Sequence, residues 1–428
     1  MKDILDIIQN NKKGLKKGIY AVCCAQPLVI EAAILQASKD NSLLLIEATA
    51  NQVNQFGGYT GMCPKAFISF VADIAQKTNF PMDNIILGGD HLGPVCWVDE
   101  KSEFAMEKAK KLVESYVVAG FSKIHLDCSM PCADDLSALT DQIIAERAAT
   151  LCEVAEQTAM KEFGAAKLVY VIGTEVPSPG GSTEEIDELE LTTVENVQQT
   201  LDTHLTAFKA KGLQAAWQRV IGLVVQPGVE FDHTSVINYQ SDKAQALSRF
   251  IAKTPNIVFE AHSTDYQLPS AYQELVNDHF AILKVGPQLT FAMREAIFSL
   301  SHIEDELINI ENRSNLKSIF EREMLEQDKH WCKFYQVPAS KGLLYRRYSY
   351  SDRLRYYWNL DIIEAAVNQL FNNLDNIDIP LPLISQYLPE QYQAIRQGRL
   401  TTKASALVID KIMQVTEIYS YACNKQIG

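Results

Sequence analysis

Two histidine–carboxylate pairs in this sequence have a spacing that places both side chains on one face of a β-strand. His125 and Asp127 are two positions apart, and so are Glu260 and His262. Successive side chains of a strand point to opposite faces, so residues at i and i+2 share a face. An imidazole beside a carboxylate suits a divalent metal site, or a general base with the group that orients it. One pair alone is more often a core histidine with its hydrogen-bonding carboxylate, but two pairs favour a functional cluster.

Asp90-His91 adds a third combination of the same residue types. The next residues, Leu92-Gly93-Pro94, cannot continue regular structure, so they predict a loop directly after a strand. In such a loop Asp90 and His91 can both face one pocket, one as a metal ligand and the other as a proton-transfer group. The candidates are therefore the metal ligands His91, His262, Glu175, Glu260 and Glu230, and the catalytic groups Asp90, Asp127 and Glu175.

Candidate substrate-binding groups follow the same kind of apolar run. The segment 51–62 is crowded with amide side chains, each of which offers donors and acceptors to sugar hydroxyls. Gly286 follows the last run, where barrels often hold a phosphate, and the hydroxyls of Ser263 and Thr264 follow the run before it. The residues expected to contact substrate are Glu47, Asn51, Gln52, Gln55, His125, Gln226, Ser263, Thr264, Asp265, Lys284, Gly286 and Arg353.

Two of the candidates stand beside loops whose role is open. Glu175 is followed by 176–182, where paired Pro and Gly suit a lid over a site, although a structural crossover is equally allowed. Glu230 lies beyond Pro227-Gly228. It either reaches the pocket or lies outside it near the start of the next helix.

Each of these groups stands near the end of a short run rich in Val, Ile and Leu. With Ile19–Ala25 as the first, about eight such runs precede residue 290, separated by helix-length stretches such as 103–119 and 141–163. Runs of this kind are typical of strands buried on both faces of a parallel sheet. They predict a (β/α)8 TIM barrel, in the α/β class. An open doubly wound sheet is the alternative, but the dinucleotide fingerprint G-x-G-x-x-G is missing.

After about residue 300 the alternation stops. Apolar residues at helical spacing predict helices in 303–310, 316–326, 362–374 and 404–421, whereas 337–351 is loop-like. We therefore predict a barrel over residues 1–300 and a mostly helical C-terminal region over 301–428. The arginines among aromatic residues in 345–358, Arg353 included, suit a phosphate clamp, an interface or a solvated surface.

The composition is that of an acidic, enzyme-sized chain. Of the 428 residues 47% are hydrophobic, and the formal net charge is −14, which disfavours nucleic acid as a partner. No apolar run is long enough for a membrane span and no signal-peptide pattern is present, so we expect a cytoplasmic protein. The nine scattered cysteines do not resemble a disulfide framework. The absence of G-x-x-x-x-G-K-[ST] disfavours a nucleotide-dependent kinase.

Long motifs in this sequence resemble the GatZ/KbaZ family of tagatose-bisphosphate aldolase subunits, and the resemblance runs over nearly the whole chain. The motifs are IEATANQVNQFGGYTGM (46–62), GGDHLGP (88–94), KIHLDCSM (123–130), VIGTEVPSPGG (171–181), VQPGVEFDH (225–233), EAHSTDYQ (260–267), LKVGP (283–287), SDRLRYYW (351–358) and ISQYLP (384–389). Motifs of this length in this order are highly specific.

The resemblance implies a barrel and a role in galactitol or amino-galactose breakdown through tagatose phosphates. It also implies a partner, the class II aldolase subunit that carries the lyase activity, which members of the family support as accessory subunits. Some members carry a tagatose-6-phosphate kinase label, and related proteins have been assigned a metal-dependent 4-epimerase activity. Asp90-His91 also resembles the Asp-His pair of class II aldolases, where Asp transfers a proton and His binds zinc.

Two function classes follow from the resemblance. The first, which the family description favours, is a subunit that supports the stability and activity of a catalytic aldolase partner. The second is a stand-alone metal-dependent ketohexose-phosphate 4-epimerase that interconverts tagatose 6-phosphate and fructose 6-phosphate. In both classes we expect a sugar-phosphate substrate and a divalent metal, with zinc as first choice. Self-association into a homo-oligomer is compatible with either.

Overall fold

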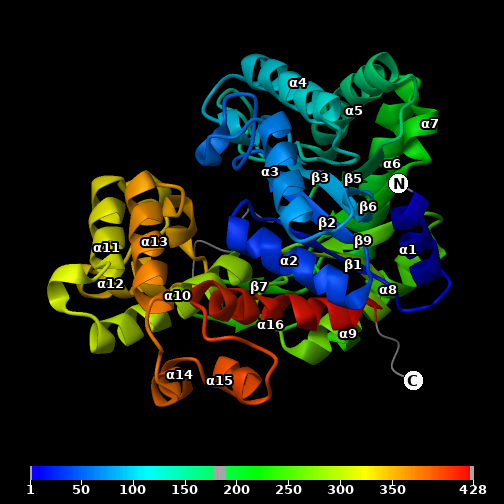
Figure 1. The fold of residues 1–428 in the computed structure, drawn as a ribbon. Coiled ribbons are helices and arrows are strands. Elements are labelled where there is room, and N and C mark those ends of the chain that lie inside the picture. Colours follow the sequence, from blue (N-terminus) through cyan, green and yellow to red (C-terminus); the bar gives the residue numbers. More distant parts are fainter. Residues whose placement is uncertain (1, 177–180, 182–188, 425–428) are drawn as a thin grey trace.

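The computed structural model describes residues 2–176, 181 and 189–424, and its core is the predicted barrel. Eight parallel strands close in the order β1-β10-β9-β6-β5-β4-β3-β2 (Figure 1). Closure excludes the open sheet that sequence periodicity left as an alternative. The barrel strands are β1 (Ile19–Val22), β2 (Leu44–Thr49), β3 (Ile85–Leu92), β4 (Lys123–Leu126), β5 (Val169–Ile172), β6 (Val220–Val225), β9 (Val258–Ala261) and β10 (Phe280–Val285).

A helix follows each barrel strand, and local sequence sets where these helices begin and end. Proline occupies the first turn of α2, α3 and α9, where its missing N–H has no helical partner to lose. α4 and α5 end at Gly120 and Gly164, whose φ angles of +108° and +67° suit glycine. The helices are α2 (Pro27–Asp40), α3 (Pro64–Lys77), α4 (Ser102–Ala119), α5 (Asp141–Phe163), α6 (Val194–Ala210), α8 (Ser241–Lys253), α9 (Pro269–Asn277) and α10 (Pro287–Leu307).

Two short elements complete the barrel region. A one-turn helix, α7 (Gln214–Trp217), precedes β6. β7 (Glu230–Phe231) and β8 (Val236–Ile237) then pair antiparallel after β6, outside the barrel. None of the helices in the described ranges combines the length and apolar character that spanning a bilayer requires.

The barrel interior changes from apolar at its N-terminal end to charged at its C-terminal end. At the N-terminal end, strand residues such as Leu45 and Ile86 form an apolar cluster separate from the main core. α1 (Lys2–Lys12) covers this end with Ile4 and Ile8, which are 0% and 1% exposed. Toward the C-terminal ends of the strands the inward side chains are charged, and they form the candidate site.

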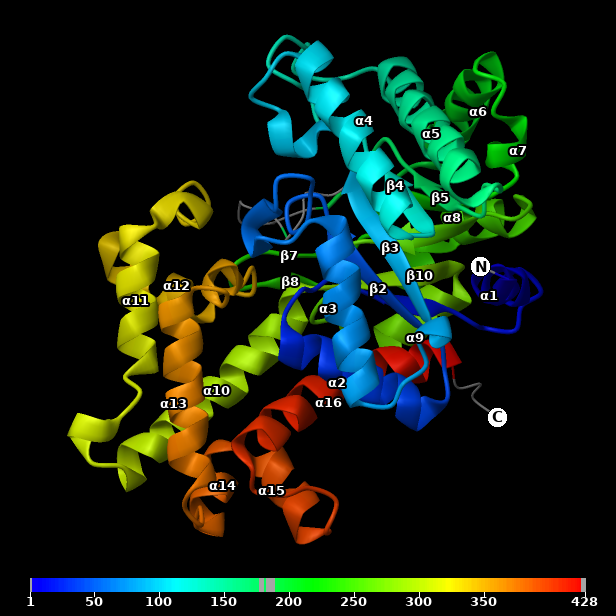
Figure 2. The same cartoon turned by 45° about the horizontal axis from the view of Figure 1, so that its top comes forward.

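α10 runs outward from the barrel and leads into the helical extension (Figure 2). The structure therefore confirms a mostly helical C-terminal region. One local expectation was wrong: 337–351, read as a loop, contains α12 (Ala339–Tyr348). The extension consists of α11 (Leu316–Glu326), α12, α13 (Asp361–Asp375), α14 (Leu381–Tyr387), α15 (Pro389–Arg396) and α16 (Ala404–Asn424).

The last helix, α16, returns to the barrel and packs against α2, α9, α10 and β1. It lies beside α2 in both views (Figures 1 and 2). Tyr419 Oη lies 3.0 Å from Thr264 Oγ1, and Gly18 N donates to Cys423 O at 3.0 Å. α16 thus fills the place in the helical ring that α10 leaves. The division into residues 1–300 and 301–428 stays a prediction, because α10 itself spans that boundary.

Candidate functional site

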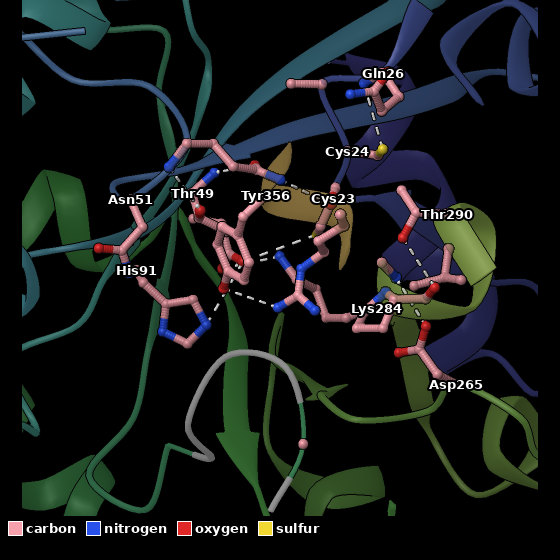
Figure 3. Close-up of a pocket in the computed structure, with 18 of the residues that line it drawn as sticks. Cys23, Cys24, Gln26, Thr49, Asn51, His91, Asp265, Lys284, Thr290 and Tyr356 are labelled. Atoms are coloured by element: carbon pink, nitrogen blue, oxygen red, sulfur yellow. Dashed lines mark hydrogen bonds and ion pairs between the residues drawn. The ribbon is translucent and has the colours of Figure 1, made fainter. Parts of the chain in front are cut away.

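A pocket opens at the C-terminal ends of the barrel strands, and the helical extension closes one side of it. Cys23 after β1, His91 on β3 and Lys284 on β10 reach it from the barrel. Tyr356 reaches it from η6 (Arg353–Tyr357). Figure 3 shows His91 on one side of this pocket and Lys284 on the other. The pocket is therefore where chemistry by the inward charged side chains can meet a ligand.

Two inward lysines hold three carboxylates together beneath the pocket. Lys123 Nζ lies 2.6 Å from Glu47 Oε1 and 2.7 Å from Glu260 Oε2. Lys284 Nζ lies 2.9 Å from Asp90 Oδ1 and also pairs with Glu47. All five side chains are at most 6% exposed, and removing one partner of a buried pair typically costs ~3–5 kcal/mol. The network therefore fixes the carboxylates at the floor of the pocket.

Both lysines are ammonium groups at neutral pH. Burial lowers the pKa of Lys123, but the charges of Glu260 and Glu47 outweigh burial and raise it. Burial is likewise outweighed at Lys284, where the charge of Asp90 helps to raise the pKa well above its usual value. An ammonium group has no lone pair to attack a carbonyl, so neither lysine is set up for Schiff-base chemistry. Lys284 can instead stabilise negative charge on a substrate oxygen.

Three histidine rings gather beside this network. The centroids of His91, His125 and His262 lie 5.1 to 5.3 Å apart. Each ring contacts a carboxylate: His91 Nδ1–Asp127 Oδ2 at 2.7 Å, His125 Nδ1–Asp90 Oδ1 at 2.9 Å and His262 Nε2–Glu260 Oε1 at 3.0 Å. Such carboxylates fix the orientation of the rings. Of the two i, i+2 pairs in the sequence, only the one on β9 is internally bonded, whereas the pair on β4 takes its partners from β3.

Four of these residues form a group that fits a divalent metal ion. Asp90, His125, Glu260 and His262 each offer one ligand atom, and the four atoms lie within 4.8 Å of one another. Among the described residues, the buried His125 Nε2 finds no hydrogen-bond partner, which is unfavourable unless it binds a ligand. Burial lowers the pKa of His262 to about 4, so its ring is neutral at neutral pH. Neutral imidazole and carboxylate are common ligands of divalent ions in proteins.

Three of the predicted metal ligands lie at this group. His262 and Glu260 belong to it. His91 borders it, with Nε2 3.7 Å from Asp90 Oδ2. His125, predicted as a substrate contact, is a member of the group as well.

The other two predicted metal ligands lie apart from the group. Glu175 is exposed and accepts hydrogen bonds from Thr192 and Asn196. Glu230 accepts the backbone N–H of Phe231, and burial raises its pKa to about 7. The lid expected after Glu175 cannot be placed, because residues 177–180 and 182 lie outside the described residues.

Half of the predicted substrate contacts line the pocket. They are Asn51, Gln52, Ser263, Asp265, Lys284 and Gly286. Glu47 and His125 lie beneath it in the charged network. The remaining four make other contacts: Gln55 with Lys108 O, Thr264 with Lys284 O and Tyr419, Gln226 with the N–H groups of Gly228 and Val229, and Arg353 with the ring of Phe334.

Several residues in or beneath the pocket were not among the predicted site residues. Lys123 had a detectable signal, since it interrupts an apolar strand two positions before His125 and therefore shares its face. Arg355, two residues beyond Arg353, reaches the pocket, and so does Cys23. Arg355 lies in the segment 345–358, whose arginines among aromatic residues suit a phosphate clamp, but that pattern does not favour it over Arg353, and Cys23 follows no such pattern.

Two residues with a strained backbone lie where β3 and β9 reach the pocket. His91 and Ser263 have φ angles of +49° and +53°, which side-chain-bearing residues rarely adopt. Close packing accompanies the strain, since a Cβ on Gly93 would lie 1.7 Å from the carbonyl oxygen of Asp127. Strained residues of this kind cost ~1–3 kcal/mol each and cluster at functional sites. The strain supports a functional role for the Asp90-His91 corner.

The fold and the site together define a class: (β/α)8-barrel proteins with a site for a divalent cation at the C-terminal mouth, where barrel enzymes carry their active sites. Comparison with known families makes this specific. The family model described as D-tagatose-1,6-bisphosphate aldolase subunit GatZ/KbaZ-like matches residues 4–424, and the chain belongs to this family.

Solved structures were also compared with this chain. A structure described as a probable tagatose 6 phosphate kinase from Sinorhizobium meliloti 1021 is 45% identical, with a TM-score of 0.88, and the match covers 95% of this chain and 100% of that chain. The YdjI aldolase from Escherichia coli K12 matches at 12% identity and a TM-score of 0.42, covering 87% and 97% of the two chains.

Proposed function

We propose that this chain is a metal-dependent ketohexose-phosphate 4-epimerase, which interconverts tagatose 6-phosphate and fructose 6-phosphate in its own barrel. The observation that carries the proposal is the group Asp90, His125, Glu260 and His262 beside the ammonium of Lys284. Family membership supports a tagatose phosphate as substrate. A purely supporting subunit has no use for this arrangement, because buried charges are weak contributors to stability.

The ion would be held by three members of the group, His125, Glu260 and His262, which leaves Asp90 for proton transfer, and we expect it to be zinc. When bound there, it supplies a Lewis acid that polarises the substrate ketone. His125 and His262 offer nitrogen ligands, and Glu260 offers a carboxylate already fixed by Lys123. His91 stays oriented by Asp127 at the edge of the group.

Asp90 is the residue placed to take a proton. Burial raises its pKa, but the charges of His91 and Lys284 hold that pKa well below its usual value, so the carboxylate is ionised. Its Oδ1 is engaged by Lys284 and His125. Its Oδ2 is 3.7 Å from His91 Nε2 and 3.9 Å from Cys23 Sγ, contacts too long for strong hydrogen bonds. Oδ2 is therefore the oxygen available to a substrate hydroxyl.

Inversion at C4 requires one proton to leave and return. Asp90 accepts the proton of the C4 hydroxyl, the C3–C4 bond breaks as C4 becomes an aldehyde, and the bonding electrons enter an enediolate over C2 and C3. Lys284, 2.9 Å from Asp90 Oδ1, stabilises this negative charge. The aldehyde turns its other face to C3, the bond re-forms, and the proton returns. No electrons are gained or lost, so no redox cofactor is needed.

A second candidate is a supporting subunit of a class II D-tagatose-1,6-bisphosphate aldolase. The family match over residues 4–424 favours it, because the family is described as aldolase subunits. This chain would then stabilise a catalytic partner during galactitol or amino-galactose breakdown in the cytoplasm. We do not extend the kinase description of the Sinorhizobium meliloti protein to this chain, since the sequence has no phosphate-binding loop of the Walker type.

The two candidates are separated by the isolated chain. Purified protein loaded with zinc and given fructose 6-phosphate, without any aldolase, should form tagatose 6-phosphate, observed by ¹³C NMR. A metal-chelated sample is the control and should be inactive. If zinc, manganese and magnesium all fail to give product, the epimerase proposal is wrong. Stimulation of an added aldolase partner would then support the subunit candidate.

A further inference from the structure

The usual phosphate position of a barrel is already filled by a side chain of this protein. Barrels often bind phosphate at the loops after the last two strands and at the N-terminus of the following helix. Here the N–H groups of Gly286 and Gln288, at the start of α10, donate to Asp265 Oδ1 at 3.0 and 2.8 Å. A phosphate at this place would compete with the Asp265 carboxylate and would face its negative charge.

The other donors near this position are also engaged. Thr264 Oγ1 donates to the carbonyl oxygen of Lys284 and points toward Tyr419 of α16. The Lys284 ammonium pairs with Glu47 and Asp90. This end of the pocket is therefore suited to a neutral hydroxyl, which can donate to Asp265, and not to a second anion.

A further cation lines the same pocket. Arg355 comes from η6 of the helical extension. Its Nη1 donates to the carbonyl oxygens of Ser351 and Asp352, and its Nη2 donates to Tyr356 Oη at 3.0 Å. These contacts use three of the five N–H groups of a guanidinium, so among the described contacts Nε–H and one Nη2–H remain for a ligand. Two N–H groups in one plane match the oxygens of a phosphate.

Neutral polar side chains line the same pocket as the guanidinium. Tyr59 and Thr60 line the same pocket from the loop after β2, and Gln26 and Asn359 line it from the other side. Gln26 Nε2 donates to Asn359 Oδ1 at 2.7 Å, which turns the amide N–H groups of Asn359 toward other acceptors. Figure 3 shows Asp265 at the far side of the pocket from Asn51. The pocket thus offers the guanidinium of Arg355 to an anion, while the N–H groups of Gly286 and Gln288 are already taken by Asp265.

We propose that the pocket selects a ketose that carries a single phosphate: Arg355 binds the phosphate, and Asp265 occupies the place that a second phosphate would need. The inference rests on the proposed function for its substrate class, a ketohexose phosphate. It adds the orientation of the substrate and the rejection of bisphosphates. Asp265 is then a specificity determinant, and Arg355 is the contribution of the helical extension to substrate binding.

Binding to the full-length, zinc-loaded chain tests this directly. Isothermal titration calorimetry with fructose 6-phosphate and fructose 1,6-bisphosphate should show at least ten-fold tighter binding of the monophosphate. Arg355→Gln should weaken monophosphate binding about 10- to 100-fold, as expected when charge-assisted hydrogen bonds are lost. Arg396→Gln is the matched control, since this exposed arginine donates to Tyr392 outside the pocket and its loss should leave binding unchanged.

Asp265 variants test the second half of the proposal. Asp265→Ala frees the N–H groups of Gly286 and Gln288, so bisphosphate binding should tighten at least ten-fold. Asp265→Asn removes the charge but keeps an acceptor for those N–H groups, so it should tighten bisphosphate binding by a smaller factor. Circular dichroism and the thermal midpoint show whether each variant is folded, and the Asn variant serves if the Ala variant is not.

The results separate this inference from the epimerase proposal. Monophosphate binding that depends on Arg355, without any turnover, would contradict the epimerase and support the inference. Wild-type protein that binds the bisphosphate as tightly as the monophosphate, or binds neither, overturns the inference. So does a folded Arg355→Gln variant with unchanged affinity.

Discussion

Five side chains form the lysine–carboxylate network of the barrel interior, and the balance of their charges explains what the site can bind. Glu47, Asp90 and Glu260 carry three negative charges, while Lys123 and Lys284 carry two positive charges, which leaves one negative charge in excess (3 − 2 = 1). An excess buried charge is unfavourable in a medium of low polarity. A divalent cation among the carboxylates and histidines would reverse the sign of this excess and make the site attractive to an anionic substrate.

The first prediction at this scale concerns metal content. A His125→Ala/His262→Ala double variant removes both nitrogen ligands from the group of four, so it should retain far less than the roughly one divalent ion per chain expected of the wild type. The measurement is elemental analysis after dialysis against trace zinc. His302→Ala, a change at an exposed histidine of α10, is the control. Equal metal content in the double variant and the control would contradict the assignment.

A second prediction follows from Glu230, whose pKa burial raises from 4.5 to about 7. The folded state binds this proton more tightly than the unfolded state, so the contribution of Glu230 to the free energy of unfolding falls as pH rises from 4.5 to 7. Glu230→Gln does not titrate and should therefore gain stability over the wild type across this window, by up to about 3 kcal/mol at pH 7. Urea unfolding at several pH values measures it. If the free energies of unfolding of the wild type and Glu230→Gln differ by the same amount at every pH, the account of Glu230 is wrong.

At the residue scale, the sequence correctly predicted which side chains at the ends of the strands lie close together. His125, Glu260 and His262 come together because strand ends converge in any parallel barrel. Loop residues were less predictable, because their direction depends on contacts made far along the chain. Glu175 follows β5 as expected yet turns toward α6, and the pocket arginine is Arg355 and not Arg353.

At the scale of elements, the strands were predictable and some helices were not. The eight apolar runs correspond to the eight barrel strands, since a strand buried on both faces must be apolar. α12 was missed because its own pattern is weak. It packs through Tyr345, whose ring lies 5.4 Å from His233 and 5.8 Å from Tyr335. Such tertiary contacts override local propensity.

The prediction at this scale concerns α1, the helix that closes the N-terminal end of the barrel. Ile8 is 1% exposed there, so Ile8→Ala should lower the free energy of unfolding by ~2–5 kcal/mol. Ile7→Ala, at a half-buried position on the same helix, should cost less. Both proteins should bind fructose 6-phosphate equally well, because α1 lies at the end of the barrel opposite the pocket. Chemical denaturation gives the stabilities, and equal losses would contradict the role of Ile8.

At the scale of the whole molecule, the helical extension supplies one helix of the ring around the barrel and one wall of the pocket. α16, the last helix, fills the outer ring between α9 and α2, while η6 brings Arg355 to the pocket. The sequence could not show this return, because amphipathic spacing identifies a helix without identifying its neighbour. The site therefore depends on residues from about 23 to 359, and the barrel alone would lack one wall.

The central claim is that this chain performs chemistry in its own barrel, and turnover by an Asp90→Asn variant tests it most directly. The change keeps size and removes the base, so the conversion of fructose 6-phosphate should fall ~10²–10⁴-fold. The ligands His125, Glu260 and His262 are unchanged, so metal content should stay close to the wild type, and circular dichroism checks that the variant is folded despite the altered pair with Lys284. Asp83→Asn, at an exposed aspartate, should stay fully active. The account predicts active wild-type protein and an inactive, folded Asp90→Asn variant; an Asp90→Asn variant with wild-type turnover would contradict it.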